Sequence, residues 1–596
     1  MPGKGDRGGK KERPKDVKGA LLRILSYLNI YKWSILGLLL LAMLSNIGNL
    51  FGPRFAGAAI SVAERGFRQG VGHVDMAMVR HYALLMLAAY VLSNILSLLV
   101  TIGMTRIGRC AAQNMRRDVF DKLMKLPVDY FDRNQAGDII SRVSYDIDVV
   151  STSLSTDVIQ ITTSLITVTG SFLMMCTISL PLVLCMVFTI PVSVLFTRHM
   201  GRLTRPLYAA RSAAYGEMNG YAEEMFGGQK TILAYAHEDE ICRRFGAVNR
   251  KAAECYKDAD SLGMTMGPTI GMISNFGLAA IGMGGALLYM NGIVGLGQIS
   301  SFVLYSRKFS GPINEISNIV NEIFSALAAS ERVFRLLDQP EEAADIYGAV
   351  ELTDAKGHVE AQDIRFGYIP GKSILRDFSM EAAPGQTVAL VGPTGAGKTT
   401  VINLLMRFYD AQEGKILVDD LAHENYSRTS LRRSYAMVLQ DTWVFRGTIF
   451  ENIAYGKENA TMEEVVQAAK AARIHNYIMR LPQGYETVIT EDGGNISKGQ
   501  KQLLTIARAM LYGTRMLILD EATSNVDTST ERQVQKAIRS LMKDRTSFVI
   551  AHRLSTIREA DRILVIEHGD VVERGTHSEL MSKRGAYYRL YASQFE

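Results

Sequence analysis

The stretch QTVALVGPTGAGKTT, residues 386–400, decides the fold of the second half of the chain. It combines an apolar strand, a glycine-rich turn and a helix start, and it matches GxxxxGK[ST] at Gly392, Gly397, Lys398 and Thr399. Backbone N–H groups of such a loop wrap phosphates, and a helix N-terminus favours negative charge. We therefore expect a phosphate-binding loop in an α/β domain.

Each residue type in this loop has a chemical task. Lys398 would reach the β- and γ-phosphates of a nucleotide, and the Thr399 hydroxyl would ligate Mg²⁺. The remaining residues would bind the nucleotide through their backbone. The predicted nucleotide-binding residues of the loop are Gly392, Pro393, Thr394, Gly395, Ala396, Gly397, Lys398, Thr399 and Thr400.

Two further strands end in residues suited to phosphate chemistry. RMLILDEATS, residues 515–524, delivers Asp520 and Glu521 at its C-terminal end, where a parallel sheet places catalytic groups. Asp520 would hold Mg²⁺ and Glu521 could polarise the attacking water. SFVIAH ends in His552, a candidate sensor of the γ-phosphate. A single strand-end acid or histidine is usually structural, and only the combination with the loop favours catalysis.

The first half of the chain is apolar enough to cross a membrane repeatedly. Residues 158–197 and 261–306 contain no Asp, Glu, Lys, Arg or His, and each run is long enough for two spans of about 20 residues. Apolar stretches near 34–53 and 83–105 add two more. We expect six membrane helices, because large buried helices of a soluble protein would carry charges on an outer face.

The charge of the connecting segments predicts the topology. The N-terminal tail is rich in Lys and Arg, and the segments 106–157 and 198–260 are long, charged and helical in pattern. The positive-inside rule places all three, and the C-terminal half, in the cytoplasm. ALLRILSYLNIYKW, residues 20–33, is amphipathic and is interpreted as a helix on the inner leaflet; the alternative is the start of the first span.

Composition divides the chain into four parts. Residues 1–16 form a basic tail, 17–336 a transmembrane domain, 337–348 a linker rich in Gly, Pro and acidic residues, and 349–596 an α/β domain. The five cysteines lack metal-ligand spacing and are expected to be apolar fillers.

At this point the chain resembles the ATP-binding cassette (ABC) exporters that fuse six helices to one cassette. The resemblance covers residues from about 17 to 590 and rests on the motifs in chain order. It implies a helical membrane bundle joined to a P-loop cassette, ATP and Mg²⁺ as ligands, and transport coupled to ATP hydrolysis. IRFGY would supply Tyr368 for stacking on adenine, the alternative being a core aromatic. VLQD would supply Gln440 as a sensor of metal and water.

The stretch NISKGQ resembles the family's signature loop, whose pattern is LSGGQ. In the family two cassettes close head to tail, so Ser497, Gly499 and Gln500 would contact the ATP of a partner chain. Lys498 replaces a glycine there, which removes conformational freedom and adds bulk, unless its side chain points to solvent. The resemblance thus implies a second half-transporter, with a heterodimer favoured over a homodimer.

Two charged segments resemble the family's coupling loops: residues 126–148 and 228–240. Tyr130, Phe131, Tyr235 and His237 are candidate contacts with the cassettes, and solvated helices are the alternative. Spans rich in Met, Leu, Gly, Ser and Thr suit hydrophobic or amphipathic cargo, of multidrug or lipid type, in the plasma (inner) membrane. A lipid flippase or peptide exporter working as a homodimer is the alternative.

Other classes of protein fit less well. A cassette-gated channel is disfavoured because no regulatory insert follows the cassette and the hydrolytic residues are present. A cassette acting on nucleic acid is disfavoured by the spans and by the lack of a basic, aromatic-rich face. Fusion of helices and cassette argues against an importer, and no peptidase domain for peptide leaders precedes the spans.

Overall fold

The structure is a computed structural model that describes residues 16–70, 73–187, 189–440, 442–490, 494–521, 528–551 and 554–595. The chain divides into two compact units. One unit holds the residues up to Leu126 together with Asn134–Gln339, and the other holds Pro127–Arg133 together with Pro340–Glu596. A short segment from the first half of the chain is therefore part of the cassette unit.

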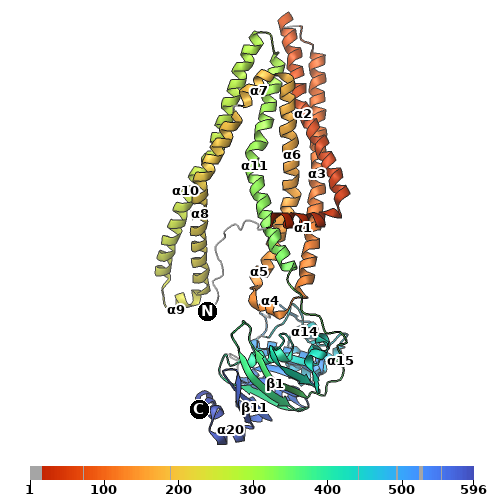
Figure 1. Cartoon of the computed structure of the whole chain (residues 1–596), viewed down its shortest axis with the longest axis vertical. Helices are drawn as coiled ribbons and strands as arrows, with labels where there is room; N and C mark the ends of the chain where they lie inside the picture. Colours follow the sequence, from red (N-terminus) through yellow and green to blue (C-terminus); the bar gives the residue numbers. More distant parts are fainter. Residues whose placement is uncertain are drawn as a thin grey trace. The chain divides into compact units, whose positions relative to one another are not determined.

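The first unit is built from long helices. In chain order they are α1 (Val17–Asn29), α2 (Lys32–Gln69), α3 (Met76–Leu123), α5 (Ala136–Ser141), a π-helical turn (Arg142–Asp146), α6 (Ile147–Ile178), α7 (Leu180–Val187), α8 (Thr189–Gly227), α9 (Gln229–Ala234), α10 (Glu238–Met290) and α11 (Leu296–Leu337). Helix α2 packs against α3, α6 and α11, whereas α10 packs against α7 and α8. Figure 1 shows α8 and α10 as a pair that leaves the other long helices on the way to α9.

Four helices in the described residues are long and apolar enough to cross a membrane. They are Lys32–Gln69, Met76–Leu123, Ala136–Ile178 and Glu238–Met290. The other two predicted spans fall in α7 and α8, between which residue 188 is not described, and in α11. The helical transmembrane region is thus confirmed, and these last two remain predictions as individual spans.

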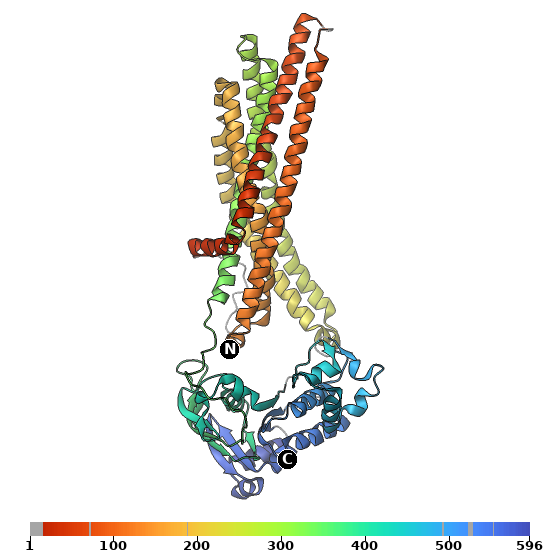
Figure 2. The ribbon, with the colours of Figure 1, turned by 90° about the vertical axis from the view of Figure 1, so that its right-hand side faces the viewer.

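Helix α1 is separate from the first long helix. It ends at Asn29, and α2 begins at Lys32. Figure 2 shows α1 lying across the direction of the long helices. Tyr27 donates a hydrogen bond to Asp118 over 2.8 Å, and Arg23 lies 2.6 Å from Asp338. The structure therefore favours a distinct helix over a simple extension of the first span.

The cassette is a mixed α/β domain, as predicted. Its ten-stranded sheet has the order β5-β4-β1-β2-β12-β11-β3-β10-β9-β6. The neighbours from β11 to β6 pair in parallel, and β5, β4, β1 and β2 pair antiparallel. The strands are β1 (Val359–Phe366), β2 (Leu375–Ala382), β3 (Thr387–Val391), β4 (Glu413–Val418), β5 (Leu421–Ala422), β6 (Tyr435–Val438), β9 (Met516–Glu521), β10 (Thr546–Ala551), β11 (Arg562–Glu567) and β12 (Asp570–Gly575); β7 (Gly447–Thr448) and β8 (Val488–Ile489) form a separate pair.

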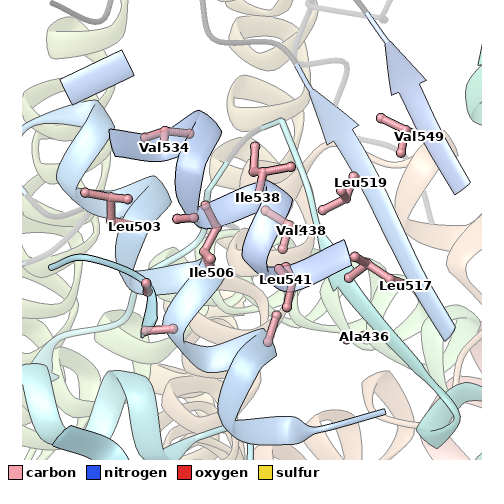
Figure 3. Close-up of a cluster of buried hydrophobic side chains, with 14 of the residues drawn as sticks. Ala436, Val438, Leu503, Ile506, Leu517, Leu519, Val534, Ile538, Leu541 and Val549 are labelled. Carbon is pink, nitrogen blue, oxygen red and sulfur yellow. The ribbon is translucent and has the colours of Figure 1, made fainter. Parts of the chain in front are cut away.

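Helices cover the sheet and bury its apolar residues. They are α12 (Lys398–Leu405), α13 (Arg428–Arg433), α14 (Ile449–Ala454), α15 (Met462–Ala471), α16 (His475–Ile478), α17 (Lys498–Tyr512), α18 (Thr528–Met542), α19 (Leu554–Glu559), α20 (His577–Lys583) and α21 (Ala586–Phe595). Figure 3 shows the core formed by α17, α18 and the strands β6, β9 and β10. The parallel strands β6, β9 and β10 have continuous apolar sequences because both faces of the sheet are covered there.

The central residues of the predicted linker, 342–345, are bound to the cassette. Arg432 forms a bidentate ion pair with Glu342, in which Nη1 lies 3.0 Å from Oε2. Arg428 bonds to the backbone carbonyl of Ala343, and its own backbone N–H donates to Asp345 over 3.1 Å. Arg428 is 7% exposed, so its own side of these contacts is buried, and together the contacts hold Glu342–Asp345 on the cassette surface.

A buried histidine beside this network predicts a loss of stability in acid. His423 is 1% exposed, and burial lowers its pKa to about 4, helped by Arg407 and Arg428 against Asp410. The unfolded chain takes up the proton near pH 6.5, so stability is complete above that pH and falls as pH drops toward 4. The gap between the two pKa values corresponds to roughly 3 kcal/mol.

The prediction is checked by thermal unfolding of the full chain between pH 7.5 and 4.5. His423→Leu should flatten the decline below pH 6.5. His568→Asn, which changes an exposed histidine in a turn, serves as the control and should leave the decline in place. An unchanged slope in the His423 variant would contradict the assignment.

Candidate nucleotide site

The loop between β3 and α12 has a backbone that requires glycine. Gly395 and Gly397 have φ values of 83° and 106°, in the region that other residues rarely adopt. A Cβ at Gly392 would lie 2.1 Å from the carbonyl oxygen of Ile566, so this position also lacks room for a side chain. The sequence pattern is thus realised as a tight loop at the carboxyl end of a buried strand.

Lys398 lies inside this loop. Its Nζ donates to the carbonyl oxygens of Gly392 and Pro393 over 2.7 and 2.9 Å. The residue is 8% exposed, and burial holds the pKa of Lys398 below its ordinary value, while Asp520 opposes that effect. The ammonium group is therefore positioned by the loop's own carbonyls, at the place where phosphate oxygens would bind.

A cleft of about 530 Å³ gathers most of the predicted site residues. It is lined by Ile374, Thr394, Gly395, Gly397, Lys398, Thr399, Thr400, Gln440, Asp520 and Ile550. Gln440 follows β6 and Asp520 lies at the end of β9, two neighbouring parallel strands. The carboxyl edge of a parallel sheet thus brings together residues that are far apart in sequence.

The donor set on this cleft fits Mg²⁺. Thr399 and Asp520 offer hydroxyl and carboxylate oxygens, and Gln440 adds an amide oxygen. Among the described residues, no cluster of three or more His, Cys, Asp or Glu could hold a metal by itself. Magnesium usually combines one or two protein oxygens with phosphates and water, so such a cluster is not needed.

The remaining catalytic candidates are only partly described. Glu521 ends β9, and its backbone pairs in register with Ala551, the residue before His552. Its side chain, His552 and the stretch SNVD at 524–527 lie outside the described residues. The strand register nevertheless brings the backbone of Glu521 next to the segment that leads to His552.

Tyr368 lies in an aromatic cluster and does not line the cleft. Its ring makes edge contacts with Phe366 and Tyr409 at centroid distances of 5.0 and 4.9 Å. Its hydroxyl accepts a hydrogen bond of 2.9 Å from Asn403 on α12. Tyr368 is half-buried, so it agrees with both interpretations: one part of the residue packs as a core aromatic, and another part is accessible for stacking on adenine.

The signature residues form a regular helix start. Ser497 caps α17: its Oγ accepts from the backbone of Gln500 over 3.3 Å, and the Gln500 side chain accepts from the Ser497 backbone over 2.8 Å. Gly499 is buried, whereas Lys498 is exposed and has no positive φ. Lysine therefore causes no backbone strain there, and its effect is limited to charge and bulk. None of these residues lines the cleft around Lys398.

The two predicted coupling segments differ in their surroundings. In α4 (Val128–Arg133), which belongs to the cassette unit, Tyr130 is 8% exposed and Phe131 is 40% exposed. In α9 no residue is buried, Tyr235 is exposed, and His237 is the N-cap of α10.

Sequence reasoning missed one contact of α4. Asp132 accepts a hydrogen bond of 2.5 Å from the Tyr409 hydroxyl. Burial, reinforced by this bond, raises the pKa of Tyr409. Asp132 lies in the predicted coupling segment 126–148 but was not among its candidate contacts, and no local signal marks Tyr409 as its partner.

A helical transmembrane region fused to a nucleotide-binding cassette defines the class of ATP-hydrolysing membrane transporters. The sequence matches the model of the ABC transporter transmembrane region over residues 35–313 and the ABC transporter model over residues 375–524. A Mycobacterium bovis protein named fatty acid ABC transporter ATP-binding/permease protein is 44% identical over 525 residues, covering 87% of this chain and 82% of that protein.

Two further comparisons agree. The ATP-dependent lipid A-core flippase of Syntrophus aciditrophicus is 33% identical over 527 residues, with 87% and 86% of the two chains covered. The solved structure of a bacterial Atm1-family ABC exporter with ATP bound superposes with a TM-score of 0.74 at 28% identity, over 95% of this chain and 99% of that one. The chain belongs to the ABC transporters, as a half-transporter of the exporter type.

Proposed function

We propose that this half-transporter uses ATP to move hydrophobic or amphipathic compounds, of multidrug or lipid type, outward across a plasma (inner) membrane, with its N-terminus and cassette in the cytoplasm. The observation that carries the proposal is the cleft that joins the loop around Lys398 to Gln440 and Asp520, in a chain with long apolar helices. Relatives named as a fatty acid transporter and a lipid A-core flippase support amphipathic cargo.

The cleft suggests how its residues divide the work. Lys398 would exchange its bonds to Gly392 and Pro393 for bonds to phosphate oxygens. Mg²⁺, held by Thr399, Asp520 and Gln440, would neutralise charge on the phosphates. Glu521 would accept a proton from the attacking water, and His552 would contact the γ-phosphate.

A second half-transporter would complete each nucleotide site. Ser497, Gly499 and Gln500 do not line this chain's own cleft, which fits a role toward a partner's ATP. We favour a heterodimer, because Lys498 adds a cation and bulk to the signature while the residues that line the chain's own cleft are intact. A homodimer is the alternative.

The experiment is to purify the chain with any half-transporter that accompanies it, determine the mass of the complex, and reconstitute it in lipid vesicles. ATP should drive movement of a fluorescent amphiphile toward the side opposite the cassettes, and hydrolysis should require Mg²⁺. ATP-independent equilibration of every amphiphile tested would refute the proposal.

Lys498→Gly discriminates between the two assemblies. In a heterodimer, this signature would face a partner cassette that is impaired in hydrolysis, and the productive site would combine this chain's cleft with the partner's signature. Lys498→Gly should then change turnover by less than about two-fold. In a homodimer, restoring glycine would raise turnover several-fold. The measurement is phosphate release in lipid, with Lys501→Ala, on the same helix, as the control.

A further inference from the structure

A lysine lies between two helices of the transmembrane unit. Lys308 on α11 donates to the backbone carbonyl of Asn49 on α2 over 2.6 Å and also contacts the Asn49 side-chain oxygen. Its Nζ lies 5.4 Å from the centre of the Tyr90 ring on α3. The neighbours of this cation are thus neutral oxygens and an aromatic ring, and none of them carries a negative charge that would neutralise it.

A second cation lies nearby and lines a cavity. Arg54 directly follows the apolar run 34–53 and borders a cavity of about 340 Å³ between α2, α6 and α11. The cavity is lined by Arg54, Gly57, Ala58, Ser61, Met174, Thr177, Ile178, Gly297, Gln298, Ser301 and Tyr305. The residues of its wall therefore include an arginine, serines, a threonine and a glutamine beside apolar residues.

The two cations belong to one continuous region. Tyr305 donates to the Leu50 carbonyl over 2.5 Å, and Ser301 donates to the Pro53 carbonyl over 2.8 Å. These bonds fix α11 against α2 between the two charges. The five residues from Asn49 to Arg54 correspond to about 7.5 Å along a helix, a span that one headgroup and its first bonds can bridge.

Neither cation has an anionic partner among the described residues, where no carboxylate forms an ion pair with Arg54 or Lys308. Arg68, on the same helix α2, does have a carboxylate partner and lies 2.8 Å from Glu64. Uncompensated charge beside an apolar membrane helix is costly and marks a functional site unless a partner is present.

We infer that Arg54 and Lys308 form a binding site for the anionic headgroup of a transported amphiphile, a carboxylate or phosphate joined to acyl chains. The guanidinium offers paired donors suited to such anions, and the ammonium adds a second charge one to two turns away. The Ser61 hydroxyl, which also lines the cavity, can bond the rest of the headgroup, whereas Thr177 and Ser301 already donate to the carbonyls of Met174 and Pro53. This inference rests on the proposed export function and names its substrate class.

The test is equilibrium binding to the full transporter in nanodiscs of neutral phosphatidylcholine. Three probes are compared: oleate, dioleoyl phosphatidate and the uncharged oleyl alcohol. Oleate or phosphatidate should bind at least about ten-fold more tightly than the alcohol, because charge-assisted hydrogen bonds form only with the anions. The two anionic probes tell whether a fatty acid or a phospholipid is preferred.

Variants connect this preference to the two residues. Arg54→Gln and Lys308→Met should each reduce the preference for anions several-fold, whereas Arg54→Lys and Lys308→Arg should retain most of it. Arg68→Gln, which removes a cation that already has a carboxylate partner, is the matched control and should not change the preference. A ratio between probes is independent of how much protein is correctly folded.

Equal binding of all three probes, or an anion preference that survives both neutral substitutions, would overturn the inference. This outcome is distinct from failure of the proposed function. If the wild-type protein still drives a neutral amphiphile outward with ATP, only the headgroup site is refuted. If ATP drives no amphiphile while anion-selective binding depends on Arg54 and Lys308, the export proposal fails and the site remains.

Discussion

Replacing Glu521 by Gln should lower steady-state ATP hydrolysis by at least about 100-fold while ATP still binds. Asp520, the residue before it, lines the cleft, and the Glu521 backbone pairs with Ala551 at the carboxyl edge of the sheet. Glutamine has nearly the same shape but cannot accept a proton from water. The contacts of Lys398 and Thr399 with ATP would remain, so the protein should bind ATP and stay in the closed state.

The measurement pairs phosphate release with binding of a fluorescent ATP analogue on the same sample. Glu567→Gln is the matched control, because Glu567 also ends a strand of this sheet but does not line the cleft. Its turnover should stay within about two-fold of the wild type. Normal turnover in the Glu521 variant would show that Glu521 is not catalytic. Loss of ATP binding would contradict the proposal that Lys398 and Thr399 bind ATP while Glu521 accepts the proton.

Much of the cassette could be predicted because its motifs are local and carry their own geometry. The run from Gln386 to Thr400 encodes a strand, a loop that requires glycine and a helix start within fifteen residues. Alternation of such units favours a parallel sheet, and a parallel sheet brings its carboxyl ends together. The meeting of Lys398, Gln440 and Asp520 in one cleft follows from that topology.

The contacts that sequence reasoning missed are an ion pair and a hydrogen bond, each between distant segments. The Glu342–Arg432 pair joins residues 90 positions apart, and the Asp132–Tyr409 pair joins residues 277 positions apart. Each residue alone looks like an ordinary surface charge or aromatic, and no periodicity indicates its partner. For the signature loop, the sequence left open whether Lys498 distorts the loop or points to solvent, and the structure shows it exposed at the start of an ordinary helix, without a positive φ.

The second large effect is expected at Asp132 and Tyr409. Tyr409→Phe should lower transport about five-fold while ATP hydrolysis falls much less. The Tyr409 ring contacts Tyr368 at 4.9 Å, and the Tyr368 hydroxyl is bonded to Asn403 on the helix that follows the phosphate-binding loop. The Tyr409 hydroxyl bonds Asp132 on α4, so one tyrosine connects the nucleotide-binding segment to the predicted coupling helix.

Phenylalanine keeps the ring contacts with Tyr368 and Phe366 and removes only the bond to Asp132. A charge-assisted hydrogen bond contributes roughly 1.5–3 kcal/mol, and the exposure of Asp132 reduces this to about 1 kcal/mol. The readout is amphiphile moved per ATP hydrolysed in the reconstituted transporter. Asp132→Ala should give the same loss, and the double variant should add little, because both changes remove one bond.

Tyr426→Phe is the matched control. The Tyr426 hydroxyl donates to the Val418 carbonyl over 3.1 Å in the same cassette and does not contact α4. Loss of this bond should lower stability without changing the ratio of transport to hydrolysis. If Tyr409→Phe lowers hydrolysis and transport in equal proportion, the hydroxyl supports the nucleotide site rather than its connection to α4. Additive effects of the Asp132 and Tyr409 changes would show that the two residues act independently.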